Sequence, residues 1–485
     1  MSLWSHVKWF RLLYQRVTSI IVYQIVTSAA LAAAAAVLIT FAQWLAGADE
    51  PMPHPNVIGP IHLLLAIVLL AVTTTLYVSL HPRTVYLTDY ACFRPSSNCR
   101  FPKATFLEYA HLWHHLNDCN VKFIDRVLQR SGMSDETYLP PVLFYIEPYC
   151  RLEEARAEAE LVVFSVIDDL LAKTCFNVHA IDILITNCSI FCPVPCITDR
   201  IVNRYKLRHD IRVINLSGMG CSAAVTAVGL AKNIMRTMPW GSHALVVSTE
   251  TIGPDYYRGN NNSMQLVNIL FRMGGAAKLL STSRSKARFR LAHVMRTLTA
   301  ANNSAYRCVH QEEDEKGNLG TALSKDLMAI AGDALKTNIT ATAPLVLPVS
   351  ELVKFFLFSV VKKLLYWKRV RPYIPNFCNA FEHFCIHVGG PAVIDSVQNG
   401  LNLSDKDVEP SRMTLHRFGN QSTASVWYEM AYIEAKRQMK KGDRVWMIGF
   451  GAGYECSTVG WVCVQPSSGV DGPWASCIHR YPVGV

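Results

Sequence analysis

Two long stretches without charge dominate the hydropathy pattern of the N-terminal part of the chain. Residues 17–48 and 58–80 contain no Asp, Glu, Lys or Arg, and a short acidic, proline-rich segment separates them. Each stretch reaches the roughly 20 residues that a helix needs to cross a bilayer. The pattern predicts an N-terminal membrane anchor over 1–81, a hairpin of two transmembrane helices. It is too long and too apolar to be a cleaved signal peptide.

The basic residues at the ends of this anchor predict its orientation. Lys8, Arg11 and Arg16 precede the first stretch, and Arg83 follows the second. Cytosolic flanks of membrane helices carry the excess of Lys and Arg. We therefore expect the N-terminus and everything after residue 81 to lie in the cytosol, where thiols stay reduced and glycosylation patterns stay unmodified.

After the anchor, apolar runs of strand length alternate with longer helical patterns. A mixed connector is expected over 82–141, and its aromatic residues should make contacts. Helices are predicted at 151–171, 323–335 and 426–440, and strands at 181–187, 213–216, 244–249, 444–450 and 458–464, while 384–388 is a short apolar segment. Such alternation predicts an α/β fold. We divide it into an N-terminal half, 82–310, and a C-terminal half, 311–485, with the site between them.

Composition narrows the class of partner. Of the 485 residues 17% are charged, the mean hydropathy is +0.17 and the formal net charge is +10. There is no dense basic tract interleaved with aromatic residues, so a nucleic-acid partner is not expected. A basic surface suits anionic lipid or the phosphates of a nucleotide-bearing substrate.

The cysteines do not form a metal motif. Cys188, Cys192 and Cys196 are evenly spaced, but prolines interrupt the segment and no second cysteine pair follows. We interpret them as small buried hydrophobic residues and predict no metal site.

Cys221 is the candidate nucleophile. An apolar run at 213–216 leads into Gly218 and Gly220, and a helix of small residues begins at the cysteine. Glycines allow a sharp turn. A thiol at a helix N-terminus is expected to favour its thiolate form, which is the nucleophile in covalent acyl transfer.

Two later segments add a histidine and an asparagine. His383 and His387 lie in one, and His416 and Asn420 lie in the other. The order Cys, His, Asn also occurs in papain-like proteases, but their motif around the cysteine is absent. The glycines at 218–220 also match a dinucleotide fingerprint. Its acidic residue should follow about 20 residues later, whereas Glu250 is farther away.

The sequence resembles the plant 3-ketoacyl-CoA synthases, the condensing enzymes of very-long-chain fatty acid elongation. Six segments carry this resemblance, at 85–92, 217–223, 270–277, 381–387, 411–420 and 441–446. The resemblance implies a thiolase-like fold of two α/β halves behind the hairpin. Soluble type III polyketide synthases share the fold and the three residues but lack the hairpin.

The resemblance also implies a role for each matched residue. Cys221 accepts the acyl group from a long-chain acyl-CoA, and His387 and Asn420 donate hydrogen bonds to the enolate formed from malonyl-CoA. The backbone N–H of Cys221, with one from the turn of Gly451 and Gly453, forms a second oxyanion hole. No cofactor is needed. His383 and His416 are expected to support the site.

The same resemblance implies a cellular setting. It implies the endoplasmic reticulum membrane, a homodimer, and elongase partners that are a ketoacyl reductase, a hydroxyacyl dehydratase and an enoyl reductase.

A few positions depart from the family pattern. Leu298 replaces a histidine, and Asn302 and Asn303 replace acidic residues; Ala224 and Pro391 also differ. An active enzyme is expected, with a catalytically weak homologue that regulates the elongase complex as the alternative. The segment 355–371, apolar with interleaved basic residues, is either a packed helix or a membrane-surface patch.

Overall fold

The computed structural model describes residues 83–485 except 147, 365–372, 468, 470 and 485. The predicted anchor over 1–81 therefore lies outside the described residues. Within the described part, no helix is both long enough and apolar enough to cross a membrane. Residues 84–485 form one compact unit.

A nine-stranded mixed sheet organises this unit, in the order β3-β2-β4-β5-β1-β6-β11-β10-β9. β2, β3 and β4 are parallel, as are β9 and β10, and the remaining neighbours are antiparallel. The strands are β1 Tyr86–Cys92, β2 Ile183–Asn187, β3 Arg212–Leu216, β4 His243–Glu250, β5 Gly274–Ser281, β6 Phe289–Leu298, β9 His383–Ile386, β10 Arg444–Gly451 and β11 Glu455–Cys463.

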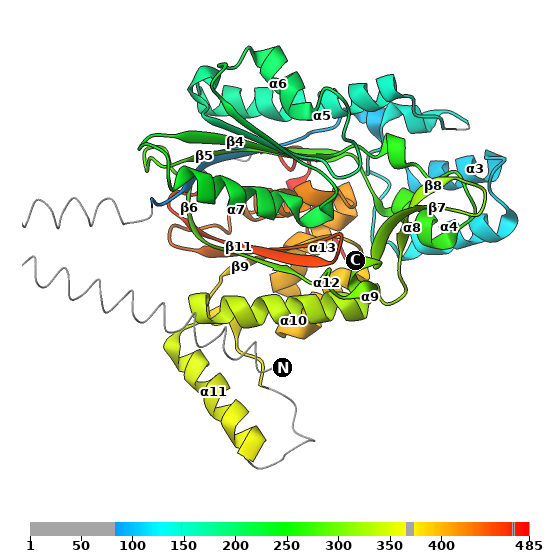
Figure 1. Ribbon diagram of the computed structural model, residues 1–485. Helices are drawn as coiled ribbons and strands as arrows, with labels where there is room; N and C mark the ends of the chain where they lie inside the picture. Colours follow the sequence, from blue (N-terminus) through cyan, green and yellow to red (C-terminus); the bar gives the residue numbers. More distant parts are fainter. Residues whose placement is uncertain (1–82, 147, 365–372, 468, 470, 485) are drawn as a thin grey trace, which may run out of the picture. The chain divides into compact units, whose positions relative to one another are not determined.

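Helices separate the sheet into layers (Figure 1). α7 (Ala223–Met235) and α14 (Ser425–Ala435) both contact strands from the two ends of the sheet order, so they form the middle layer. α5 (Leu152–Thr174) and α6 (Ile197–Tyr205) cover one outer face, and α10 (Leu327–Val346) covers the other. The remaining α-helices are α3 Lys103–Leu112, α4 Asp118–Arg130, α8 Asn262–Leu270, α9 Asn303–Tyr306, α11 Val349–Leu364, α12 Pro391–Leu401 and α13 Asp405–Phe418.

The two ends of the sheet repeat one arrangement. β4 and β5 follow the middle-layer helix α7, and β10 and β11 follow α14. The ends are joined where β1 pairs with β6 at only two positions. β6 pairs with β11 along its length, so a strand that precedes residue 310 lies in the same half of the sheet as β9, β10 and β11.

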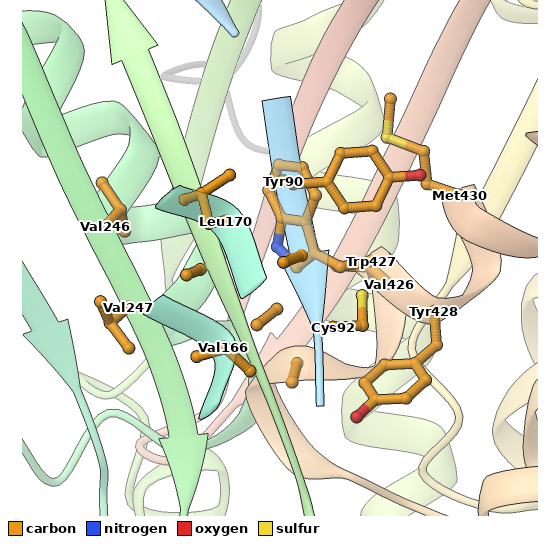
Figure 2. Close-up of a cluster of buried hydrophobic side chains, with 14 of the residues drawn as sticks. Tyr90, Cys92, Val166, Leu170, Val246, Val247, Val426, Trp427, Tyr428 and Met430 are labelled. Atoms are coloured by element: carbon orange, nitrogen blue, oxygen red, sulfur yellow. The ribbon is translucent and has the colours of Figure 1, made fainter. Parts of the chain in front are cut away.

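The middle layer is buried, and it combines very small residues on α7 with a very large one on α14. α7 exposes almost nothing of Ala224, Ala227 and Ala231, and a Cβ on Gly229 would lie 3.0 Å from Val294. From α14, Trp427 projects into the core beside Tyr90 and Cys92 of β1 (Figure 2). Small residues let the helix approach the sheets, and the indole fills the remaining space.

Most predicted elements are confirmed, but two regions differ. The connector over 82–141 contains β1, a central strand, which its mixed polar pattern hid. The helix predicted at 323–335 begins only at Leu327, because residues before it form the hairpin of β7 (Val309–Glu313) and β8 (Leu319–Leu323). Asp314 stabilises the hairpin turn by accepting the N–H groups of Lys316 and Asn318.

We predict that Trp427→Ala lowers the free energy of unfolding by about 3–5 kcal/mol, because it empties a packed core site. Trp240→Ala is the matched control, since Trp240 is 66% exposed, and it should change stability by less than about 0.5 kcal/mol. Thermal unfolding of both variants measures the difference. Equal shifts would show that Trp427 does not hold the layers together.

Candidate active site

The turn that carries Cys221 connects β3 to α7. A 3-10 turn, Gly220–Ser222, directly precedes the helix, and Gly218 and Gly220 have φ values of +68° and +69°. A Cβ on Gly220 would lie 2.6 Å from the backbone nitrogen of Ala452. Glycine is therefore required there both for the backbone conformation and for the approach of the β10–β11 turn.

The Cys221 thiol lies beside a hydroxyl and a carboxyl group. Ser422 Oγ is 3.3 Å from Cys221 Sγ and 3.1 Å from Glu250 Oε2. Burial raises the pKa of the Cys221 thiol to about 12, the hydrogen bond from Ser422 lowers it, and Glu250 raises it. The expected thiolate is thus wrong for the free site, because loss of hydration outweighs the position at the helix N-terminus.

His387 follows the end of β9 and is 5% exposed. Burial lowers the pKa of its imidazole to about 4, so the ring is neutral at physiological pH. Its Nδ1 has no hydrogen-bond partner among the described residues. The ring also lies against Gly389, where a Cβ would be 3.1 Å from Nε2. A neutral imidazole carries one N–H, so it can donate a hydrogen bond through that nitrogen and accept a proton at the other.

Hydrogen bonds fix the orientation of the Asn420 amide. Its Oδ1 accepts the backbone N–H of Ser422 at 2.8 Å. Its main chain bonds to Leu270 and Arg272, which holds the segment against the end of α8. With the oxygen engaged, the Nδ2 group is left to donate to a ligand.

One cavity of about 480 Å³ brings Cys221, His387 and Asn420 together. Glu250, Ser422, Gly451 and Gly453 also line it. Its remaining walls are largely apolar and include Ile190, Val267, Phe271, Val309, Leu323, Leu327, Val393 and Phe450. The cavity therefore combines a polar reacting end with space for a hydrocarbon chain.

The second predicted oxyanion hole is only partly defined. Gly451 and Gly453 line the cavity as expected. The backbone N–H of Ala452, between them, already donates to Met219 O at 3.1 Å. The Ala452 N–H is therefore already engaged and is not the oxyanion donor of this turn.

The two predicted supporting histidines do not line the cavity. His383 begins β9, and its Nε2 is 2.9 Å from Asp443. His416 lies on α13, and its Nδ1 is 3.1 Å from the Tyr481 hydroxyl. His383 thus supports the strand that leads to His387, whereas His416 connects α13 to the C-terminal segment.

The positions that depart from the family pattern are placed at element ends. Leu298 is 55% exposed at the end of β6, and Asn302 caps α9 by accepting two backbone N–H groups. Asn303 is the first residue of α9, and Pro391 is the first of α12, where proline suits a helix start. Ala224 is buried in α7. None of the five lines the cavity.

Ser422 and Glu250 are functional candidates that the sequence analysis missed. Glu250 accepts the backbone N–H groups of Ser189 and Ile190 at 2.9 Å, and burial raises the pKa of its carboxyl group. In the sequence, Glu250 could have been recognised as a charged residue at the end of an otherwise apolar strand. Cys188 also bonds to Glu250, and the described residues hold no cluster of three metal-ligating side chains.

Comparisons with known proteins agree with this geometry. The model for the FAE1/type III polyketide synthase-like proteins matches residues 77–364, and that for the C-terminal part of 3-oxoacyl-[acyl-carrier-protein] synthase III matches 379–462. The crystal structure of PKS-I from the brown alga Ectocarpus siliculosus superposes with a TM-score of 0.61 and 17% identity, covering 79% of this chain and 99% of that one. The fold is therefore that of the thiolase-like condensing enzymes.

Curated relatives narrow the family. The chain is 49% identical to 3-ketoacyl-CoA synthase 5 of Arabidopsis thaliana, covering 88% of this chain and 87% of the relative. It is 51% identical to 3-ketoacyl-CoA synthase 4 of the same plant, covering 84% and 80%. The chain belongs to the 3-ketoacyl-CoA synthase family.

We predict that alkylation of Cys221 accelerates continuously between about pH 6 and pH 10, because its thiolate fraction keeps rising below the raised pKa. Ser422→Ala should slow the reaction about fivefold by removing a stabilising hydrogen bond. Mass spectrometry of the Cys221 peptide after iodoacetamide treatment measures the rate. Ser411→Ala is the control, because it removes a buried serine hydroxyl that donates to Glu429 and does not line the cavity. This variant should leave the alkylation rate of Cys221 unchanged. A plateau near neutral pH would contradict the raised pKa.

Proposed function

We propose that this protein condenses a long-chain acyl-CoA with malonyl-CoA to give 3-ketoacyl-CoA, CoA and CO₂. The observation that carries the proposal is the meeting of Cys221, His387 and Asn420 in one largely apolar cavity. The names of its relatives support the same reaction.

The first step transfers the acyl group to the enzyme. Cys221 Sγ attacks the thioester carbonyl, a C–S bond to the enzyme forms, and the C–S bond to CoA breaks. The thiol proton leaves with CoA, so no net charge is created. Because the thiol is protonated when free, it must lose its proton as the substrate arrives. His387, which lines the same cavity, is the group to which we assign transfer of that proton.

The second step forms the carbon–carbon bond. Malonyl-CoA loses CO₂, and its electron pair stays on an enolate whose oxygen receives hydrogen bonds from His387 and Asn420. The enolate carbon attacks the acyl thioester, and Cys221 leaves as a thiolate that takes up one proton. Donors fixed in advance within a buried site stabilise such a charge strongly.

The alternative, a catalytically weak homologue that regulates the elongase complex, rests on Leu298, Asn302 and Asn303. All three lie outside the cavity lining, whereas the three reacting groups lie within it. This distribution favours an active enzyme.

We predict that His387→Ala and Asn420→Ala each lower the condensation rate about 100- to 1000-fold, since each removes one donor to the enolate. Labelled malonyl-CoA, acyl-CoAs of graded length and microsomes that contain the protein provide the assay. His416→Ala is the matched control, because His416 lies outside the cavity, and this variant should retain most activity. Absence of product from a well-expressed wild-type protein at every acyl length would support the regulatory alternative.

We further propose that residues 17–48 and 58–80 anchor the protein in the endoplasmic reticulum membrane, with the catalytic part in the cytosol. α11 presents Val349, Val353 and Leu357 on one face with exposures of 74%, 49% and 56%, which favours the membrane-surface interpretation of this region. The elongase reductases and dehydratase are the expected partners. β3 ends the sheet order, and this edge strand is suited to pairing in a homodimer.

We predict that protease added to sealed microsomes removes tags from both termini of the full chain, while a tag inserted at 49–57 is protected, because the flanks carry the basic residues. Detergent should expose all three tags. Protection of the C-terminal tag in intact vesicles would reverse the proposed orientation.

A further inference from the structure

Lys278 is an ammonium group within the core. It lies on β5, and its side chain is completely buried. Among the residues that the structure describes, it forms no ion pair. Its Nζ donates to Ser248 Oγ and, at 3.2 Å, to the carbonyl of Ala276. The same nitrogen lies 5.4 Å from the ring centre of Trp427, a side chain labelled in Figure 2.

A continuous chain of buried hydrogen bonds leads from Lys278 to the active site. Asn187 Nδ2 donates to Ser248 Oγ at 2.9 Å, and Asn187 Oδ1 accepts the Thr423 hydroxyl at 2.9 Å. Thr423 Oγ1 in turn accepts the backbone N–H of Ala224 at 2.6 Å. The chain thus links β5, β4 and β2 to the first turn of the helix behind Cys221.

This chain of hydrogen bonds connects the segment that carries Asn420 to the turn that carries Cys221. Thr423 directly follows Ser422 and lies three residues after Asn420, whereas Ala224 lies three residues after Cys221. An ammonium group only donates, so it fixes the direction of its own hydrogen bond with Ser248, whose Oγ must accept. An uncharged amine can donate or accept, and the direction would no longer be fixed.

We propose that Lys278 is a positioning residue for condensation, which holds the Cys221 turn against the Asn420–Thr423 segment through Ser248, Asn187 and Thr423. This inference rests on the proposed function. Burial lowers the pKa of the Lys278 ammonium to about 7, with Cys92 of β1 opposing the shift. Two titratable groups face Lys278 from β1, namely Cys92 and Tyr90, which lies opposite Lys278 in the β1–β5 register; β4 and α14 present Ser248 and Trp427.

Lys278→Met separates a positioning role from a structural one. Below its lowered pKa, wild-type Lys278 is charged in the core, which destabilises the folded state; this cost is relieved as pH rises from about 7 towards the unfolded value near 10.4. The variant should therefore unfold at a higher temperature than wild type at pH 6. Its kcat should nevertheless fall about fivefold, with KM unchanged, because the anchor is lost.

The pH profile gives a second readout. The ratio of wild-type to Lys278→Met kcat should decrease as pH rises through about 7, and the ratio cancels the titration of Cys221. Lys232→Met, which replaces a lysine on α7 itself, is the matched control. The ratio of wild-type kcat to Lys232→Met kcat should not change with pH. A wild-type to Lys278→Met ratio independent of pH, or an unchanged kcat in Lys278→Met, would overturn the proposal.

Ser248→Ala breaks the chain one step closer to the site. It should lower kcat about as much as Lys278→Met but should also lower stability, since the ammonium group loses an acceptor. The double variant should be no slower than either single variant, because both changes interrupt one path. Additive losses of kcat would overturn the proposal.

Alkylation of Cys221 tests the positioning role of Lys278 separately from the proposed condensation activity. If wild type makes no condensation product, that function fails. Alkylation, which needs no substrate, then provides the same comparison: both single variants should alter its rate to the same extent, and the double variant no further. Unaltered alkylation would refute the positioning role by itself.

Discussion

The site depends on the close approach of two turns that come from opposite ends of the sheet. Gly220, before the nucleophile, leaves no room for a Cβ against Ala452, and Ala452 N–H donates to Met219 O. A side chain at Gly451 would overlap Ser222 in the same way. This contact fixes the Cys221 turn against the β10–β11 turn. The cavity forms around that junction.

Loss of hydration decides the charge state of the groups at this junction. Burial raises the pKa of Cys221 and lowers that of His387, so each is displaced towards its neutral form. Glu250 is displaced in the same sense. The Cys221 thiol and the His387 imidazole are therefore both neutral in the free site at physiological pH. The negative charge of an enolate would appear only during reaction, where fixed donors stabilise it most effectively.

Local sequence patterns predicted most of the elements and the turn that carries Cys221, because apolar runs and glycine turns are encoded within short segments, whereas the roles of His387 and Asn420 were predicted from the family resemblance. Interactions between distant residues could not be predicted. Ser422 and Glu250 are 172 residues apart, and buried Asp89 in β1 is matched by Arg288. The protonation of Cys221 was mispredicted for the same reason: the helix N-terminus is local, whereas burial arises from the whole fold.

The direction of the strands explains why so many separate segments converge. β3 leads to Cys221, β4 ends at Glu250, β9 leads to His387 and β10 ends at Gly451, so each contributes from its carboxyl end. Ligands in α/β sheets bind outside those ends. The β7–β8 hairpin and α8 then add apolar walls that do not belong to the repeated halves. The reacting groups thus follow strands of the duplicated halves, whereas elements outside the repeat supply apolar walls. Residues in those walls can differ in size, and so change acyl selectivity, without moving the reacting groups.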